Sequence, residues 1–111
     1  MKRFCLALDL INDPSLIAEY EAFHEKIWPE IETGIKSAGI VNMEIYRVEN
    51  RLFMIVETTA DFSFEKKSLQ DATNPFVQKW EELMWKFQQP LPSAKQGEKW
   101  ILMQKIFELN K

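Results

Sequence analysis

The chain has 111 residues, which is enough for one domain around a single hydrophobic core, and we expect residues 1–111 to form that domain. Hydrophobic residues make up 46% of the chain and aromatic residues 13%, a composition typical of a globular protein and not of a disordered one. The formal net charge is −3 and the basic residues are scattered, so we expect neither DNA nor RNA as a partner.

A first strand is predicted near the start of the chain, because phenylalanine and leucine recur at every second position from residue 4 to residue 10. Asp9 interrupts the apolar run, which is too short for a signal peptide, and no stretch approaches the ~20 apolar residues of a spanning helix. We therefore expect a cytoplasmic protein without a membrane partner.

The lone Cys5 is expected to be a small buried side chain, and it can form no disulfide within the chain.

A helix is predicted to begin at Pro14, because Asp13 is a common capping residue and proline is tolerated at the first helical position. Apolar residues then recur at steps of three and four, which predicts a single buried stripe. The stripe comprises Leu16, Tyr20, Phe23, Ile27, Ile31 and Ile35. Pro29 removes a backbone hydrogen bond, so we expect a kink or break near residues 25–29. Gly39 is expected to end the helix in the left-handed conformation.

A β-hairpin is predicted from residues 43–48 and 52–58, with Asn50 at positive φ in the turn between them. Asp61 is expected to cap a short helical stretch that extends to Gln70.

Another helix is predicted from Pro75, with Asn74 as its cap. Its apolar face is expected to comprise Phe76, Trp80, Leu83 and Phe87. Two prolines and a glycine predict a loop over residues 88–97. The β-branched and aromatic residues from 100 to 107 favour a last strand.

The predicted order is β-α-β-β-α-β, which indicates an α+β, ferredoxin-like fold: a four-stranded antiparallel sheet with the helices on one face. Residues 52–56 and 100–103 are apolar at both odd and even positions, whereas a sheet with one face in water would alternate. The uncovered face therefore needs a cover, and a second copy packed sheet to sheet about a two-fold axis is the simplest one. We expect a homodimer of the dimeric α+β-barrel type.

His24 is the only histidine and the main candidate for chemistry, since its side chain exchanges protons near neutral pH. Tyr20 and Trp28 lie four residues before and after it, so aromatic rings flank it on a helix. An aromatic wall beside a proton-transfer group suits a sugar or another small neutral ring. A histidine at the edge of the core, without chemistry, is the alternative interpretation.

Several other chemistries are disfavoured by the sequence. Zinc sites use several histidine or cysteine ligands and the chain has one of each, so we expect no metal. No Gly-x-Ser-x-Gly elbow is present, although composition alone leaves a Ser-His-Asp arrangement open. The three glycines lie far apart, which argues against phosphate and dinucleotide loops.

Trp80 and Glu81 on the second predicted helix are, by themselves, typical of a core tryptophan and a solvated carboxylate. Both helices of a ferredoxin-like fold flank the same sheet, so the fold allows Trp80 and His24 to face one cavity.

The segment Glu19-Tyr20-x-x-x-His24-x-x-Ile27-Trp28-Pro29-Glu30, followed by Ile45-Tyr46 and Val77-Gln78-Lys79-Trp80, resembles the L-rhamnose mutarotase family over nearly the whole chain. The resemblance implies a cytoplasmic homodimer with a dimeric α+β-barrel fold that interconverts the α and β anomers of a 6-deoxy-L-sugar without a cofactor. It also implies that His24 is the proton donor and that Tyr20 and Trp80 contact the substrate.

Two positions depart from the family's pattern. Met43 stands where the rhamnose enzymes carry another substrate-contacting tyrosine, and Glu81 stands where they carry a second sugar-binding tryptophan. Both positions belong to the implied pocket, so both are candidate substrate-binding residues.

The preferred sugar substrate is predicted from two further features of the sequence. Residues 43–47 and 89–92 resemble a branch of the family assigned to L-fucose mutarotation. L-Fucose and L-rhamnose differ in configuration at C2 and C4, and a carboxylate at position 81 accepts hydrogen bonds from a repositioned hydroxyl. We therefore favour L-fucose over L-rhamnose.

Two alternative functions stay open. Cofactor-free monooxygenases use the same dimeric architecture and aromatic cavities, and a module that binds a small metabolite without turning it over needs the same cleft. The second acid-base group of a mutarotase is also open, with Glu81 and a bound water as candidates.

Overall fold

The computed structural model describes residues 1–110. The helices are α1 (Pro14–Glu25), α2 (Pro29–Ser37), α3 (Phe64–Ala72) and α4 (Pro75–Trp85). The strands are β1 (Lys2–Leu10), β2 (Ile40–Val48), β3 (Arg51–Thr58), β4 (Gln88–Gln89) and β5 (Ile101–Leu102). None of the helices within residues 1–110 has the length and apolar character needed to cross a membrane.

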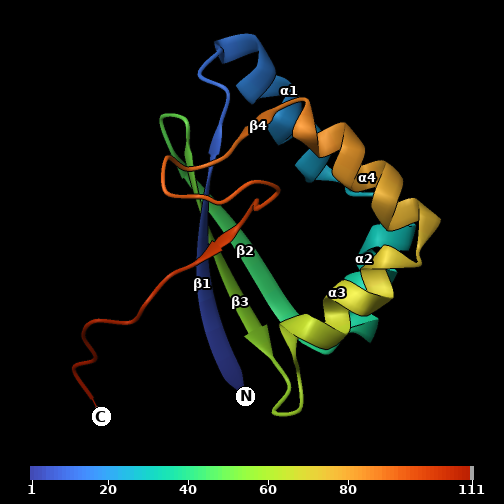
Figure 1. Cartoon of the computed structure of the whole chain (residues 1–111), viewed down its shortest axis with the longest axis vertical. Coiled ribbons are helices and arrows are strands. Elements are labelled where there is room, and N and C mark those ends of the chain that lie inside the picture. The colour runs from blue at the N-terminus through green and yellow to red at the C-terminus, as the bar shows by residue number, and fades with distance from the viewer. Residues whose placement is uncertain (111) are drawn as a thin grey trace.

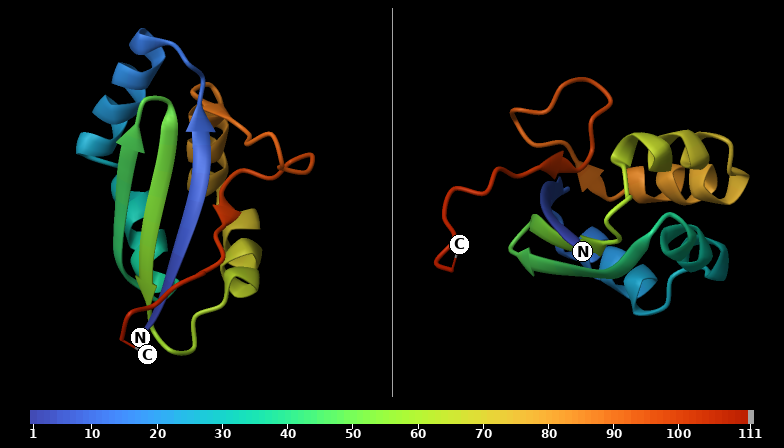
Figure 2. Two further views of the ribbon diagram at one scale, coloured as in Figure 1. Left: turned by 90° about the vertical axis from the view of Figure 1, so that its left-hand side faces the viewer. Right: turned by 90° about the horizontal axis from the view of Figure 1, so that it is seen from below.

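The strands form one antiparallel sheet in the order β2-β3-β1-β4, and β5 also pairs with β1. The four helices lie on one face of this sheet and leave its other face uncovered within the described chain (Figures 1 and 2). This arrangement confirms the predicted α+β class and the ferredoxin-like order, with a pair of helices in each crossover.

β1 has the predicted alternation of side chains. Leu6, Leu8 and Leu10 are buried beneath the helices, and each such side chain contributes ~1.5–3 kcal/mol relative to exposure. Cys5 lies on the opposite face and is half-buried, so the prediction of a buried cysteine is wrong. The reason is that no helix covers this face of the sheet.

The break predicted near residues 25–29 divides α1 from α2. Asp13 caps α1, because its carboxylate accepts hydrogen bonds from the backbone N–H groups of Ser15 and Leu16 at 2.9 and 3.1 Å. Pro29 is the first residue of α2, where its missing N–H costs nothing.

Two turns depend on a positive φ. Gly39 follows α2 with φ of +100°, as predicted, and a Cβ there would lie 2.8 Å from Thr59 Oγ1. In the hairpin the residue with positive φ is Glu49, at +52°, so the prediction of Asn50 is wrong. Asn50 binds Leu10 instead: its backbone oxygen accepts from Leu10 N at 2.7 Å, and its Nδ2 donates to Leu10 O at 3.1 Å.

The cap of α3 is Ser63 and not Asp61, so this prediction is also wrong. Ser63 Oγ accepts a hydrogen bond from Lys66 N at 3.3 Å. The Asp61 carboxylate accepts from the Thr59 hydroxyl at 2.7 Å, because the chain is still in a turn at this residue.

α4 begins at Pro75 behind the Asn74 cap, as predicted. The buried residues of α4 and its C-terminal extension are Val77, Trp80, Met84 and Phe87. Phe76 is 46% exposed and Leu83 is half-buried, so the predicted face is partly wrong. Two stripes with helical spacing pass through Trp80, and the sequence period alone does not distinguish them.

The end of the chain departs most from prediction. Gln88–Gln89, predicted as loop, form β4 because they pair with β1. The predicted strand over 100–107 is wrong beyond Leu102: Met103 N donates to Cys5 O at 2.7 Å, and the chain then leaves the sheet (Figure 1). Phe107 is 73% exposed, since residues 103–107 have no surface against which to pack.

The core lies between sheet and helices and has two clusters of buried residues. One cluster surrounds Leu10, Tyr20 and Trp80, and the other surrounds Met54 and Phe62. Residues from both clusters line a cavity.

Candidate functional site

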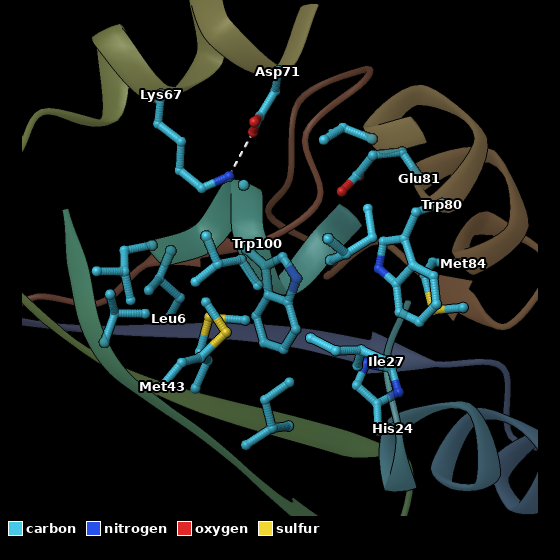
Figure 3. A pocket seen from close by; sticks show the side chains of 18 of the residues that line it. Leu6, His24, Ile27, Met43, Lys67, Asp71, Trp80, Glu81, Met84 and Trp100 are labelled. Atoms are coloured by element: carbon cyan, nitrogen blue, oxygen red, sulfur yellow. Dashed lines mark hydrogen bonds and ion pairs between the residues drawn. The ribbon is translucent and has the colours of Figure 1, made fainter. Parts of the chain in front are cut away.

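A pocket of about 330 Å³ lies between the sheet and the helices (Figure 3). This volume is within the range of about 300–1,000 Å³ typical of small-molecule sites. All five residues predicted from the sequence line it: His24, Tyr20, Trp80, Glu81 and Met43. The structure therefore brings together side chains from α1, α4 and β2.

His24 lies in the last turn of α1, and its imidazole is held by the helix itself. Its Nδ1–H donates a hydrogen bond to the backbone oxygen of Tyr20 at 2.8 Å, which assigns the proton of the neutral ring to Nδ1. No hydrogen bond within residues 1–110 occupies Nε2. Burial lowers the pKa of His24, and the hydrogen bond to Tyr20 opposes this in part. Nε2 is therefore available as a proton acceptor near neutral pH.

Two aromatic rings flank the imidazole. The ring centroid of Tyr20 lies 4.3 Å from that of His24, and the ring centroid of Trp80 lies 5.6 Å from it. Trp28 packs edge-on against Trp80 with centroids 5.0 Å apart. Tyr20 lies beside His24, as predicted, but the prediction that Trp28 flanks it on the same helix is wrong, because α1 ends at Glu25. Trp80 on α4 is the second direct neighbour.

Tyr20 is 3% exposed and lines the same pocket. Burial raises the pKa of its hydroxyl to about 12; a hydrogen bond with the Gln88 side chain opposes the rise, and the charge of Glu81 adds to it. Tyr20 therefore keeps its proton at neutral pH, so it can donate a hydrogen bond and cannot act as a base.

Glu81 has a partner that the sequence did not indicate. Lys99 Nζ donates to Glu81 Oε2 at 2.5 Å and to the Glu81 backbone oxygen at 3.0 Å. The Lys99 ammonium also lies 4.6 Å from the centre of the Trp85 ring. The carboxylate is thus held on α4 as a hydrogen-bond acceptor.

Met43 belongs to the apolar part of the pocket. It projects from β2 and is half-buried, and it packs against the core cluster that contains Met54. Trp100, from the segment before β5, also lines this space (Figure 3). Its position was missed because the sequence pattern placed it in a long strand.

A second ion pair lies on the α3 side of the pocket. Lys67 Nζ and Asp71 Oδ2 are 2.5 Å apart, and Figure 3 shows both side chains entering the pocket away from His24. Their spacing of four residues on a helix is the usual one for a surface pair, so nothing in the sequence pattern distinguishes them from such a pair. Among residues 1–110 no three potential metal-ligating side chains gather at one place.

Comparison with known proteins identifies a family and relatives for this chain. A family model described as L-rhamnose mutarotase matches residues 3–109. An L-fucose mutarotase of Xanthomonas campestris pv. campestris is 42% identical over 112 residues, which cover 99% of this chain and 90% of that protein.

Solved structures show the same fold. An L-rhamnose mutarotase from Formosa agariphila, 21% identical, superposes with a TM-score of 0.72 over 98% of this chain and 99% of that one. A dimeric ferredoxin-like protein from an uncultured marine organism, 16% identical, gives a TM-score of 0.58 over 84% and 95% of the two chains.

The fold and the pocket define a ferredoxin-like α+β protein with an aromatic, small-molecule-sized site. Because the family model spans nearly the whole chain and a relative is 42% identical, the chain belongs to the L-rhamnose mutarotase family, which consists of isomerases acting on carbohydrates. The resemblance noted in the sequence is confirmed.

Proposed function

We propose that this single-domain chain interconverts the α and β anomers of a 6-deoxy-L-sugar, with L-fucose as the preferred substrate and His24 as the acid-base group. The observation that carries the proposal is the geometry of His24: Nδ1 is bound to Tyr20 O at 2.8 Å, while Nε2 is unoccupied within residues 1–110 and the ring lines the pocket. Such a group typically contributes about 10²- to 10⁴-fold to a proton-transfer reaction.

The proposed reaction transfers protons and breaks and re-forms one bond, the C1–O5 bond of the sugar ring. Neutral His24 takes the proton of the anomeric hydroxyl at Nε2, the C1–O5 bond breaks with its electron pair on O5, and C1 becomes an aldehyde. The imidazolium then returns the proton to O5. After rotation about C1–C2, the reverse steps close the ring on the other face of C1, so no proton is consumed and no cofactor is required.

Tyr20 and Trp80 support this reaction in different ways. Since the pKa of Tyr20 is raised to about 12, its hydroxyl is a donor for the oxygen on which negative charge develops. The Trp80 ring offers a flat apolar surface to one face of the sugar. Both roles require the sugar to lie against α1 and α4.

Two observations favour L-fucose. The 42% identical relative that covers 99% of this chain is named an L-fucose mutarotase. The Glu81 carboxylate bound by Lys99 offers an acceptor to the sugar, so it favours the epimer whose hydroxyl points toward it. Met43 adds apolar surface to the same pocket.

A homodimer is part of the proposal. The uncovered face of the sheet carries half-buried apolar residues, among them Phe53 and Ile55 on β3, and the segment after β5 leaves Phe107 73% exposed. A second copy packed on this face buries these side chains. The cytoplasm stays the expected location.

Saturation-transfer NMR on L-fucose and L-rhamnose side by side tests the proposal, because it reports interconversion of the anomers directly. We expect the protein to accelerate exchange for both sugars and more strongly for L-fucose. Binding without any acceleration would indicate a binding module, and oxygen uptake with a coloured quinone product would indicate a monooxygenase.

A further inference from the structure

Gln88 lies where α4 passes into the sheet, and the backbone fixes its position. It is the first residue of β4 and pairs with Leu10 of β1, while Phe87 O next to it accepts a hydrogen bond from Ile11 N at 2.8 Å. The residue is 6% exposed, and its side chain lines the pocket together with His24 and Tyr20. The two-residue strand β4 therefore holds the polar side chain of Gln88 inside the site.

The amide oxygen of Gln88 has no partner. Gln88 Oε1 is buried, and among the described residues 1–110 it is the one buried side-chain polar atom without a hydrogen bond. Roughly 90% or more of buried polar groups in proteins are paired, and an unpaired acceptor destabilises the fold. The Tyr20 hydroxyl is hydrogen-bonded to the amide of the same side chain and does not pair Oε1, so a ligand in the pocket is the remaining source of a donor.

We propose that Gln88 determines sugar specificity, with Oε1 accepting a hydrogen bond from the hydroxyl at C2 or at C4 of the bound 6-deoxy-L-sugar. The inference rests on the proposed function and adds a residue to it. L-Fucose and L-rhamnose differ at these two carbons, so a hydroxyl that meets Oε1 in one sugar points away from it in the other.

The chemistry of the pocket explains why such a contact discriminates. An amide oxygen and the Glu81 carboxylate both accept hydrogen bonds, whereas a sugar hydroxyl can donate to either of them. The epimer that fails to reach Oε1 leaves a buried acceptor unpaired, and sites of this kind reject the wrong substrate more strongly than apolar pockets do.

The variant Q88M tests the inference, because methionine has nearly the same length and carries neither amide atom. The dependence of the exchange rate on sugar concentration gives KM for L-fucose, L-rhamnose, 2-deoxy-L-fucose and 4-deoxy-L-fucose. We expect Q88M to raise KM for L-fucose by about tenfold or more. For the deoxy analogue that lacks the contacted hydroxyl, we expect Q88M and the wild type to have the same KM.

A purely structural role for Gln88 predicts a different pattern. Removal of an unpaired acceptor would then raise the thermal midpoint of Q88M and leave every KM unchanged, and this result would overturn the inference. Q89M is the matched control, since Gln89 is the exposed neighbour in β4, and it should leave all four KM values unchanged. Q88N shortens the side chain by one methylene, and we expect it to raise KM for L-fucose less than Q88M does. Q88N serves as the test variant if Q88M does not fold.

The outcomes separate this inference from the proposed function. Exchange by the wild type with unchanged KM in folded Q88M or Q88N removes the role of Gln88 and leaves the mutarotase proposal in place. Absence of exchange by the wild type on all four sugars overturns both.

Discussion

Lys99 Nζ lies 2.5 Å from Glu81 Oε2 and 3.0 Å from the Glu81 backbone oxygen, so one ammonium group joins the segment before β5 to helix α4. The Lys99 side chain is 14% exposed, whereas that of Glu81 is 47% exposed. The pair is therefore more protected than an ordinary surface ion pair, although water still screens the carboxylate. Trp100 follows Lys99 directly and lines the pocket, so this contact also determines one wall of the site.

K99M should loosen this wall and leave Glu81 without its cation. We expect a loss of about 1 kcal/mol in the free energy of unfolding, because a partly exposed charged hydrogen bond disappears. We also expect a several-fold lower exchange rate for L-fucose, measured by NMR. K95M removes a lysine from the same loop and should change neither quantity, and K99R should restore most of the activity. Equal activity in K99M and K95M would show that the contact is only structural.

H24A should leave the chain folded and slow anomer exchange by roughly tenfold or more. The reason is that the variant removes the imidazole whose Nε2 is available to the substrate. E19A, an exposed carboxylate on the same helix, is the control for helix stability and should retain full activity. Near-normal exchange in folded H24A would exclude His24 as the acid-base group.

The pH dependence of stability should report the His24 environment. Burial lowers the pKa of His24 in the folded chain below its ordinary value of 6.5, so the unfolded chain binds a proton at a higher pH than the folded one. The histidine contribution is therefore absent above pH 6.5, and stability falls as the pH drops from 6.5 to the folded pKa. Below that pKa the loss is constant.

Thermal midpoints of the wild type and H24Q between pH 7.5 and 5 measure this contribution. The difference between the two proteins should change only below about pH 6.5, with the wild type losing more stability. A wild type that gains stability relative to H24Q in acid would mean that the folded pKa is raised instead.

The parts of the fold with local signals were predicted well from the sequence. β1 follows from an alternation within nine residues, and the starts of α1 and α4 follow from a capping residue beside a proline. His24 was found because it is the only histidine and Tyr20 lies one helical turn before it, and the resemblance to the family added Trp80. The fold supports this grouping, because both helices flank the same sheet.

The rest depends on contacts between distant residues, which local patterns do not encode. Lys99 reaches Glu81 across 18 positions of the chain. Gln88 enters the pocket only because β4 pairs with β1, and Pro90 and Pro92 nearby indicate a loop. The predicted buried face of α4 was partly wrong because residues 76 and 77 are both apolar. Packing against the rest of the fold, and not the spacing in the sequence, decides which of the two is buried.

The proposed homodimer predicts a mass in solution of twice the 13.2 kDa of the chain, measured by light scattering at micromolar concentration. I55E places a charge on the uncovered face of β3 and should shift the protein toward the monomer. L69E adds the same charge at a residue of α3 that is 68% exposed and should leave the dimer intact. A monomeric wild type would exclude the dimer.

Met43 and Glu81 should contribute, together with Gln88, to the preference between the two sugars, since both line the pocket and both depart from the pattern of the rhamnose enzymes. An indole at position 81 would leave Lys99 without its carboxylate partner, so E81W is best combined with K99M. We expect M43Y/E81W/K99M to shift the ratio of kcat/KM from L-fucose toward L-rhamnose by about tenfold, because an acceptor is lost and aromatic surface is gained. M43L/K99M keeps Glu81 and approximates the original volume at position 43, so its ratio should follow that of K99M. An equal shift in M43L/K99M would mean that loosening of the pocket, and not the chemistry at positions 43 and 81, sets the preference.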